Sequence, residues 1–438
     1  MTPHEIGVAM FGGIAVLLIA RVPVGIAMLV AGGAGYAAIA GWWPLLNTLK
    51  TLPFSRFSSY TLSVIPLFLL MGEFATKGGM NAALFRAARA WLGHRRGGLA
   101  LATIGGCAAF GAICGSSLAT AATMSKVAWP EMRRAGYSPA LATGTLAAGG
   151  TLGILIPPSI ILVIYAIYTE QSIGNLFVAA AVPGLLATAG YMLVVHVHAR
   201  LAPAAAPPSP RLPWRLRFHE SREIWPAALV FLLVVVGIYR GWFSPTEGAA
   251  VGAAAVGLLA VAVGGMRLSG LLESLLATAE TSALMFLILL GAEVFSAALA
   301  LSRLPASVSA WVVSLGLSPM TVLAVILGAY LVLGCAMESL AMVLLTLPVF
   351  VPLMLALDFG LDATQRLVWF GILVLVAVEV GMISPPFGLN LFVINALAKD
   401  VPMTETWRGV LGFCASDLVR LVLLVAFPNL SLWLPGLA

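Results

Sequence analysis

Two kinds of short segment in this sequence place glycine, serine and proline inside long apolar runs, and each kind occurs twice. The first pair is GAICGSSLATAATMSKVAWPEM, which starts at Gly111, and GILIPPS, which starts at Gly153. The second pair is GCAMESLAMVLLTLPVFVPLM, which starts at Gly334, and GMISPPF, which starts at Gly381. A helix interrupted in this way within a membrane leaves backbone carbonyls and amides that need partners in protein, water or a ligand. Carbonyl and hydroxyl oxygens can then replace the water around Na⁺, and the N-terminal ends of half-helices favour an anionic group.

The two pairs are copies of one pattern. The tripeptide SLA at Ser117 recurs at Ser339, 222 residues later, and the dipeptide PP at Pro157 recurs at Pro385, 228 residues later. Glycine, serine and proline also occur in membrane helices merely to allow close packing or a kink, and that interpretation stays open for any one segment. Four interruptions in two matched pairs favour instead the kind of binding site that secondary transporters have.

The composition places the whole chain in a membrane. Of its 438 residues, 61% are hydrophobic and 9% are charged, and so few charges could not cover the surface of a soluble protein. Apolar runs long enough to cross a bilayer core of about 30 Å recur from end to end, which indicates helices rather than the strands of a barrel. We therefore predict an all-α integral membrane protein. The net charge of +6 does not indicate nucleic-acid binding, because the basic residues lie between apolar runs.

Lysine and arginine set the expected orientation, because they collect in cytoplasmic connections. They cluster between residues 77 and 96, at 133–134 and at 200–222. Counting crossings from these faces puts the N-terminus and the C-terminus on the periplasmic side and gives two repeats of inverted topology. The first predicted repeat is 1–200, with a re-entrant hairpin at about 98–130 and a broken helix at about 138–170. A cytoplasmic Pro/Arg-rich linker follows at 201–223. The second predicted repeat is 224–438, with a hairpin at about 319–356 and a broken helix at about 365–398. In the first broken helix we expect interruptions at 149–151 and at Pro157.

Five ionisable residues lie inside apolar runs, where a charge suggests a function by default. Glu338, at the expected tip of the second hairpin, either caps the following half-helix or lies near a bound cation. Glu379 and Lys126 either belong to the site or reach water or an internal partner. Asp417 and Arg420, three residues apart on one helix, are expected to neutralise each other, with a contact to another subunit as the alternative.

The same segments carry a resemblance to a known family. PLFLLMGEFATKGGM at Pro66, the GSSLA hairpin, GILIPPS, the GCAMES hairpin and GMISPPFGLN occur in the order seen in the large membrane subunit of the tripartite ATP-independent periplasmic (TRAP) transporters, and the resemblance covers essentially the whole chain. It implies a Na⁺-driven importer of organic anions, carboxylates or sugar acids, in the bacterial cytoplasmic (inner) membrane. It further implies an elevator motion, in which the hairpins and broken helices form a transport domain that moves past a scaffold.

The resemblance also implies two protein partners. One is a periplasmic substrate-binding protein that delivers the organic anion, and the other is a small four-helix membrane subunit. The chain contains no additional four-helix block beside its two halves, so we expect a separate chain to supply the small subunit.

Site residues follow from the resemblance at the matching positions, with two or more Na⁺ ions as coupling ions and no catalytic residue. The Na⁺ ligands implied at the first hairpin tip and its facing break are Gly115, Ser116, Ser117, Gly153, Ile156 and Pro158. The Na⁺ ligands implied in the second half are Gly334, Gly381 and Ser384. The residues that we expect to contact the organic anion are Ser116, Thr120, Ser159, Glu338, Ser339 and Asn390. Ser159 and Asn390 come just after the breaks, where they either line a cavity or cap half-helices.

Three other functional classes fit the sequence less well. A stand-alone sodium/anion permease of the same superfamily would need no binding protein. An ion channel could also contain re-entrant hairpins, but channel pores usually form in symmetric oligomers rather than between two inverted halves of one chain. An intramembrane enzyme would need a nucleophile and a base, and the apolar segments around Ser116 and Ser117 contain no histidine. We therefore predict that the protein is not an enzyme.

Overall fold

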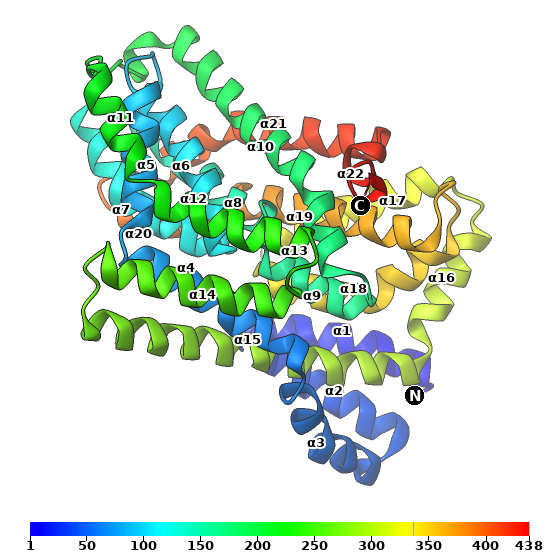
Figure 1. Ribbon diagram of the computed structural model, residues 1–438. Helices are drawn as coiled ribbons and strands as arrows, with labels where there is room; N and C mark the ends of the chain where they lie inside the picture. The colour runs from blue at the N-terminus through cyan, green and yellow to red at the C-terminus, as the bar shows by residue number, and fades with distance from the viewer. Residues whose placement is uncertain (336, 438) are drawn as a thin grey trace.

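The protein is built from helices. A computed structural model describes residues 1–335 and 337–437, and all the regular elements in these two ranges are helical (Figure 1). Within the same ranges, seven helices are long and apolar enough to cross a membrane, and the number rises to nine if each of two bent helix pairs is one span. The prediction of an all-α integral membrane protein is confirmed.

The N-terminal helices surround two turns that require glycine. These helices are α1 (Pro3–Ile19), α2 (Val24–Ala40), α3 (Trp42–Phe57), α4 (Val64–Lys77) and α5 (Met80–Leu92). Gly41, between α2 and α3, has φ +93°, and Gly79, between α4 and α5, has φ +73°, a region in which a side chain is strained. The axis of α3 and that of the segment Tyr60–Lys77 meet at 59°, so this part of the chain is one of the two bent pairs.

The first half contains a helical hairpin followed by a broken helix. The hairpin consists of α6 (Gly98–Cys114) and α7 (Ser117–Arg134), which are separated by two residues. The broken helix consists of α8 (Pro139–Leu155) and α9 (Ile160–Thr169), and α10 (Ile173–Leu201) follows it. The four residues between α8 and α9 include the predicted interruption at Pro157.

The other interruption predicted in this segment is wrong, because α8 continues without a break through residues 149–151. The two glycines there serve close packing instead. A Cβ on Gly149 would lie 2.8 Å from the sulfur of Cys107 in α6, and a Cβ on Gly150 would lie 2.5 Å from the Cβ of Ala121 in α7. Both hairpin arms therefore pack directly on the backbone of α8, as small residues permit in membrane proteins.

The second half repeats the same order after a linker that contains the short helix α11 (Trp214–Arg222). It begins with α12 (Trp225–Phe231), a π-helical turn (Leu232–Val236), α13 (Gly237–Tyr239), α14 (Pro245–Ala262), α15 (Leu268–Ser302) and α16 (Leu304–Ser314). The hairpin helices α17 (Pro319–Gly334) and α18 (Ser339–Ala356), the broken helix α19 (Ala363–Ile383) and α20 (Leu389–Leu397), and the last helices α21 (Met403–Ala426) and α22 (Asn429–Leu432) follow. The Pro157–Pro158 and Pro385–Pro386 peptide bonds, one in each break, are both cis.

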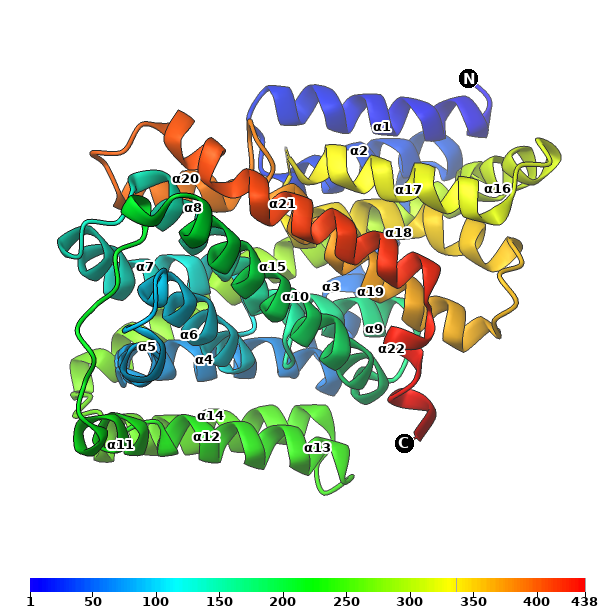
Figure 2. The ribbon, with the colours of Figure 1, turned by 90° about the horizontal axis from the view of Figure 1, so that it is seen from above.

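The two hairpins lie at opposite ends of the molecule. In Figures 1 and 2, α6 and α7 lie at the left, on the same side as α5 and α11, whereas α17 and α18 lie at the right, beside α16. Both termini lie toward the right-hand end in the two views. The helix hairpins therefore point toward each other, and their tips reach the middle of the fold.

The two helices that precede the breaks form the centre of the core. Every residue of α8 from Leu141 to Leu155 is buried, as is every residue of α19 from Leu367 to Ile383. Because they are buried on all sides, these two segments lie in the interior of the protein and not at its lipid-facing surface. Beside this core, α2 packs along α15, where a Cβ on Gly32 would lie 2.6 Å from the Cα of Phe295.

Candidate functional site

Each hairpin touches the facing broken helix through a pair of glycines. A Cβ added to Gly111 of α6 would lie 2.8 Å from the Cα of Gly153 in α8. In the second half, a Cβ added to Gly334 of α17 would lie 2.9 Å from the Cα of Gly381 in α19. Backbone approaches this close leave no room for a side chain on either helix. The two halves therefore bring hairpin and break together by the same device.

The tip of the first hairpin turns at Gly115, whose φ of +64° suits glycine. Ser116 then caps α7, because its hydroxyl accepts a hydrogen bond from the amide of Ala119 at 3.4 Å. A Cβ on Gly115 would lie 2.8 Å from the carbonyl oxygen of Pro158, so that carbonyl lies against the tip. The break thus presents a main-chain oxygen to the turn of the hairpin.

Further oxygen atoms surround Gly153. A Cβ at this position would lie 2.6 Å from the carbonyl oxygen of Ser116 and would overlap the hydroxyl of Thr120. Thr120 is fully buried, and its hydroxyl has no hydrogen-bond partner among the residues that the structure describes. Buried polar groups normally have partners, so an unsatisfied hydroxyl at this point is consistent with a site that a bound ion would complete.

The tip of the second hairpin is capped by a carboxylate instead of a hydroxyl. Glu338 accepts a hydrogen bond from the amide of Ala341 at 3.0 Å and another from the hydroxyl of Ser339 at 3.2 Å. Of the two roles predicted for Glu338, capping is therefore observed directly.

The residues next to the breaks are also held by hydrogen bonds. Ser159 is fully buried and caps α9, with its hydroxyl accepting from the amide of Leu162 at 3.4 Å. Ser384, which ends α19, donates from its hydroxyl to the carbonyl of Val380 at 2.7 Å, and its own carbonyl accepts from the amide of Gly388 at 3.0 Å.

Both hairpin tips line one small cavity, called here the hairpin-tip cavity, with a volume of about 40 Å³. Its wall includes, among others, Gly115, Ser116, Ser117, Glu338, Ser339, Ile164 of α9 and Met285 of α15. A space of this size holds one or two groups as large as a water molecule, which is enough for an ion but too little for an organic acid. The cavity therefore marks the point at which the two hairpin tips meet.

Asn390 ties the second broken helix to the first hairpin. From α20, its Nδ2 donates to the hydroxyl of Ser117 at 2.8 Å and to the carbonyl of Ala147 in α8 at 3.1 Å. Its Oδ1 is buried and has no partner among the described residues. Two residues that the sequence assigned to the site separately, 273 positions apart, are thus in direct contact.

A buried group of charges lies one turn from the two breaks. Arg420 of α21 contacts Glu379 at 2.7 Å and Asp417 at 3.0 Å, and all three side chains are at most 4% exposed. Tyr191 of α10 donates to Asp417 at 2.6 Å, and its hydroxyl is 3.0 Å from that of Thr151 in α8. The predicted pairing of Asp417 with Arg420 is observed, and Glu379 is added to it.

The structure therefore sorts the residues that we expected to contact the organic anion. Ser116, Glu338 and Ser339 line the hairpin-tip cavity, whereas Thr120, Ser159 and Asn390 are buried outside its described lining.

Lys126 is exposed, which agrees with a side chain that reaches water. Sequence reasoning missed Tyr191 and Thr151. A tyrosine within an apolar helix was the available signal, because its hydroxyl needs a partner when it is buried.

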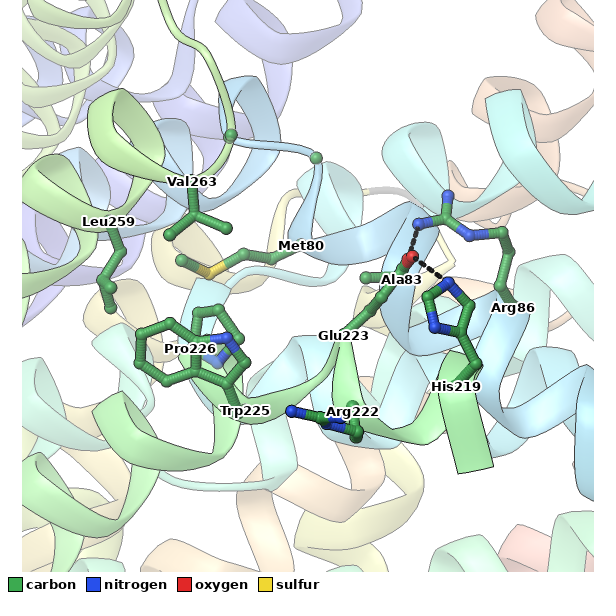
Figure 3. A pocket seen from close by; sticks show the side chains of 13 residues that line it. Met80, Ala83, Arg86, His219, Arg222, Glu223, Trp225, Pro226, Leu259 and Val263 are labelled. Atoms are coloured by element: carbon green, nitrogen blue, oxygen red, sulfur yellow. Dashed lines mark hydrogen bonds and ion pairs between the residues drawn. The ribbon is translucent and has the colours of Figure 1, made fainter. Parts of the chain in front are cut away.

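A larger hollow, of about 610 Å³, lies away from this site. It is bounded by the turn between α4 and α5, the junction of α11 with α12 and the end of α14, and Figure 3 shows Arg86 and His219 directed at Glu223 on its rim. The hydrogen bond to Glu223 raises the pKa of the Arg86 guanidinium above its ordinary value. Since Arg86 and His219 both contact Glu223, and none of the predicted site residues lines this hollow, it is not a candidate for the transport site.

Comparison with known proteins assigns a family to this architecture. Residues 11–430 match the family model described as "Tripartite ATP-independent periplasmic transporter, DctM component". The chain is 39% identical to the C4-dicarboxylate TRAP transporter large permease protein DctM of Pseudomonas aeruginosa, over 89% of this chain and 90% of that protein. It is 32% identical to the sialic acid TRAP transporter large permease protein SiaM of Vibrio cholerae, over 86% of this chain and 87% of that protein.

Among solved structures, the chain is similar in fold to the YdaH transporter of Alcanivorax borkumensis. The TM-score is 0.62, the sequence identity is 16%, and the match covers 95% of this chain and 98% of that one. The named relatives are transporter permeases rather than enzymes, in agreement with the prediction that the protein is not an enzyme.

Proposed function

The chain belongs to the family of the tripartite ATP-independent periplasmic transporters, DctM component, and from this membership we propose that it is the permease subunit of a Na⁺-coupled importer of organic anions. The proposal extends to the coupling ion, the class of substrate, the partners and the motion.

One observation carries the proposal: the tips of two hairpins that enter from opposite ends meet at one cavity beside two interrupted helices. Interrupted helices expose backbone oxygens and half-helix N-termini, and irregular backbone is tolerated within a membrane where it lines a site. An arrangement with an approximate two-fold relation between its halves offers the same kind of site to both sides of the membrane in turn, as alternating access requires.

The first Na⁺ site would lie between the first hairpin tip and the break after α8. Its ligands would be the carbonyl oxygens of Ser116, Gly153 and Pro158, with the hydroxyl of Thr120, which is buried and unsatisfied among the described residues. Carbonyl and hydroxyl oxygens suit a hard cation, and their number and closeness would set the selectivity. Thr120 therefore fits the ion better than the organic anion.

A second Na⁺ site would lie between Gly334 and Gly381, where the backbones of α17 and α19 are in contact. The carbonyls of these two glycines and of Ser384 are the candidate ligands. The hydroxyl of Ser384 is a further candidate ligand. It donates its hydrogen to the carbonyl of Val380, away from the break, so a lone pair on the hydroxyl oxygen stays available to an ion.

The organic anion would bind where the hairpin tips face each other. The half-helices α7, α9 and α18 each begin at a capping residue near this point, and helix N-termini favour a negative group. The relative with 39% identity is named for C4-dicarboxylates and another for sialic acid, so carboxylates and sugar acids are the proposed substrate class.

The partners follow from the tripartite family. We propose that a periplasmic binding protein delivers the substrate and that a separate small membrane subunit completes the transporter, in the bacterial inner membrane with both termini on the periplasmic side. The buried unit that contains α6–α9 and α17–α20 would move as an elevator relative to the layer that contains α1, α2 and α15.

Reconstitution in proteoliposomes tests the proposal. The permease, its small subunit and its binding protein should accumulate a radiolabelled organic acid, with succinate and sialic acid as first probes, only when an inward Na⁺ gradient is imposed. K⁺ of equal concentration and ionic strength is the matched control. Uptake that is indifferent to the Na⁺ gradient would refute the coupling, and equal uptake without the binding protein would identify a stand-alone permease.

A further inference from the structure

A second cavity lies beside the hairpin-tip cavity, and the two spaces share Ile164 in their walls. It has a volume of about 290 Å³ and is lined, among others, by Arg56, Tyr168, Glu170, Glu293, Ser296 and Leu344. We call it the Arg56 vestibule. Its wall combines α3 and α15, which lie beside the layer around α2, with α9 and α18 of the buried unit. Volumes near 300 Å³ are at the lower end of small-molecule sites, as a small organic acid would require.

The polar groups of the vestibule come from both sides of this boundary. Nη2 of Arg56 in α3 contacts both carboxylate oxygens of Glu293 in α15 at 3.0 Å. Tyr168 of α9 and Ser296 of α15 face each other with their hydroxyl oxygens 3.1 Å apart. A carboxylate held on a guanidinium is thus already present, supplied by the protein itself.

The vestibule leads to the hairpin-tip cavity. Ile164 lines both spaces, and two other helices contribute residues to each space four positions apart: Met285 and Leu289 on α15, and Leu340 and Leu344 on α18. Four residues along a helix are a rise of about 6 Å, so the two spaces are one helical turn apart along the same three helices.

The open side of this path is the end that carries the N-terminus. Along α15, the residues run from Met285 at the hairpin-tip cavity to Glu293 and Ser296 in the vestibule, and α15 ends at Ser302. Ser302 packs against Gly7 of α1, next to the N-terminus. In the proposed orientation this end is periplasmic, which is the side from which a binding protein would release the substrate.

We propose that the Arg56 vestibule is an outer binding site for the substrate carboxylate, in which the anion replaces Glu293 on the guanidinium of Arg56 before it passes Ile164 to the hairpin tips. This inference rests on the proposed function. Arginine presents a planar fork that binds carboxylates with two parallel hydrogen bonds.

The exchange is energetically accessible because the existing ion pair is exposed. The side chain of Arg56 is 50% exposed and that of Glu293 is 31% exposed, and ion pairs with this access to water contribute little to stability. The protein carboxylate therefore holds the guanidinium in place without blocking it. Glu293 acts as a placeholder that an incoming carboxylate can displace.

Three variants separate this role from a structural one. Arg56→Gln removes the anion-binding charge, Glu293→Gln frees the guanidinium, and Lys50→Gln removes an equal charge from an exposed position of the same helix as a control. Uptake is measured in the reconstituted three-component system, with the acid that the unchanged protein accumulates and with the loaded binding protein varied up to saturation. Gel filtration and thermal unfolding of each variant show that it is folded, and Arg56→Lys serves as a milder second change.

We expect Arg56→Gln to lower the maximal uptake rate about tenfold, the usual effect of losing one charge-assisted hydrogen bond, at an unchanged half-saturating concentration of binding protein. Glu293→Gln should exceed the rate of the unchanged protein, because the incoming carboxylate no longer displaces a charged group from Arg56, and Lys50→Gln should equal it. Equal losses in Arg56→Gln and Glu293→Gln would mean that the ion pair is only structural. A change in the half-saturating concentration of binding protein would mean that Arg56 contacts that protein instead. Either result overturns the inference while leaving Na⁺-driven uptake by the unchanged protein intact.

Discussion

An alanine at Gly334 should weaken Na⁺ coupling, because it forces apart two helices that meet beside the second break. The added Cβ would lie 2.9 Å from the Cα of Gly381. Carbon atoms that are not bonded prefer a separation of about 3.5–4.0 Å, so α17 and α19 would have to move apart by roughly 0.6–1.1 Å. Overpacking of this kind costs about 1–3 kcal/mol, which corresponds to about a 5- to 140-fold change in an equilibrium constant.

The assay is the Na⁺ dependence of uptake in reconstituted vesicles. We expect the Na⁺ concentration for half-maximal uptake to rise in Gly334→Ala, by at most that factor, because the backbone oxygens beside the break are displaced from one another and only the strain that differs between the Na⁺-bound and Na⁺-free states changes the affinity. Gly328 provides the matched control, since it lies on the same helix and an added Cβ there meets nothing within 4 Å. Alanine is favoured over glycine in a helix by about 1 kcal/mol, so Gly328→Ala should fold at least as well as the unchanged protein.

The comparison between these two variants shows whether the close approach of α17 to α19 affects Na⁺ coupling. If Gly334→Ala and Gly328→Ala show the same Na⁺ dependence, the close approach of α17 to α19 is a packing feature and not part of an ion site. The corresponding change in the first half is Gly111→Ala, whose Cβ would lie 2.8 Å from the Cα of Gly153. It should raise the Na⁺ requirement in the same way, as measured in the same vesicles.

Three further changes have defined outcomes. Asn390→Leu removes two buried hydrogen bonds to the first hairpin and α8, so the melting temperature in detergent should fall and uptake should be lost, whereas unchanged uptake would show that the contact is dispensable. Arg420→Met leaves two carboxylates buried without a cation and should destabilise the fold by about 3–5 kcal/mol, far more than Glu379→Gln does. Thermal unfolding of the two variants measures this difference, and similar melting temperatures would contradict the reasoning. Glu338→Gln keeps an oxygen that can cap Ala341 but removes the charge, so binding of the organic acid should depend less on Na⁺ in a binding assay with and without Na⁺.

The helix order and the breaks were predictable because they depend on local chemistry. Proline removes an amide donor and glycine tolerates positive φ, so the interruptions at Pro157 and Pro385 could be placed from the residues alone. Glycine on its own was ambiguous. Gly150 lies within an unbroken helix and serves close packing with Ala121, because a missing Cβ permits either a turn or an approach.

The contacts between the two halves were not predictable from one sequence. Ser117 and Asn390 were both assigned to the site, yet nothing in their spacing shows that one hydrogen-bonds to the other across 273 positions. The ion pair of Arg56 with Glu293 is likewise formed by helices that are far apart in sequence. Periodicity and turn chemistry describe single elements, whereas such pairs depend on how the elements are packed.

The two hairpin tips share a backbone design but differ in their capping side chain, and this difference bears on how the binding of Na⁺ and of the organic acid would be coupled. Glu338 lines the same small cavity as Ser116 and Ser117, so the second tip presents a carboxyl group where the first presents hydroxyls. The proposed site for the organic anion requires this space to open, and an anion bound there on the order of 5 Å from Glu338 would repel a negative charge on that side chain by about 3 kcal/mol at an effective dielectric constant of 20. That repulsion alone would weaken anion binding about a hundredfold. A cation bound beside Gly334 would offset it, so the proposed function predicts that Na⁺ and the organic acid bind cooperatively, with the carboxyl group of Glu338 as one source of the coupling.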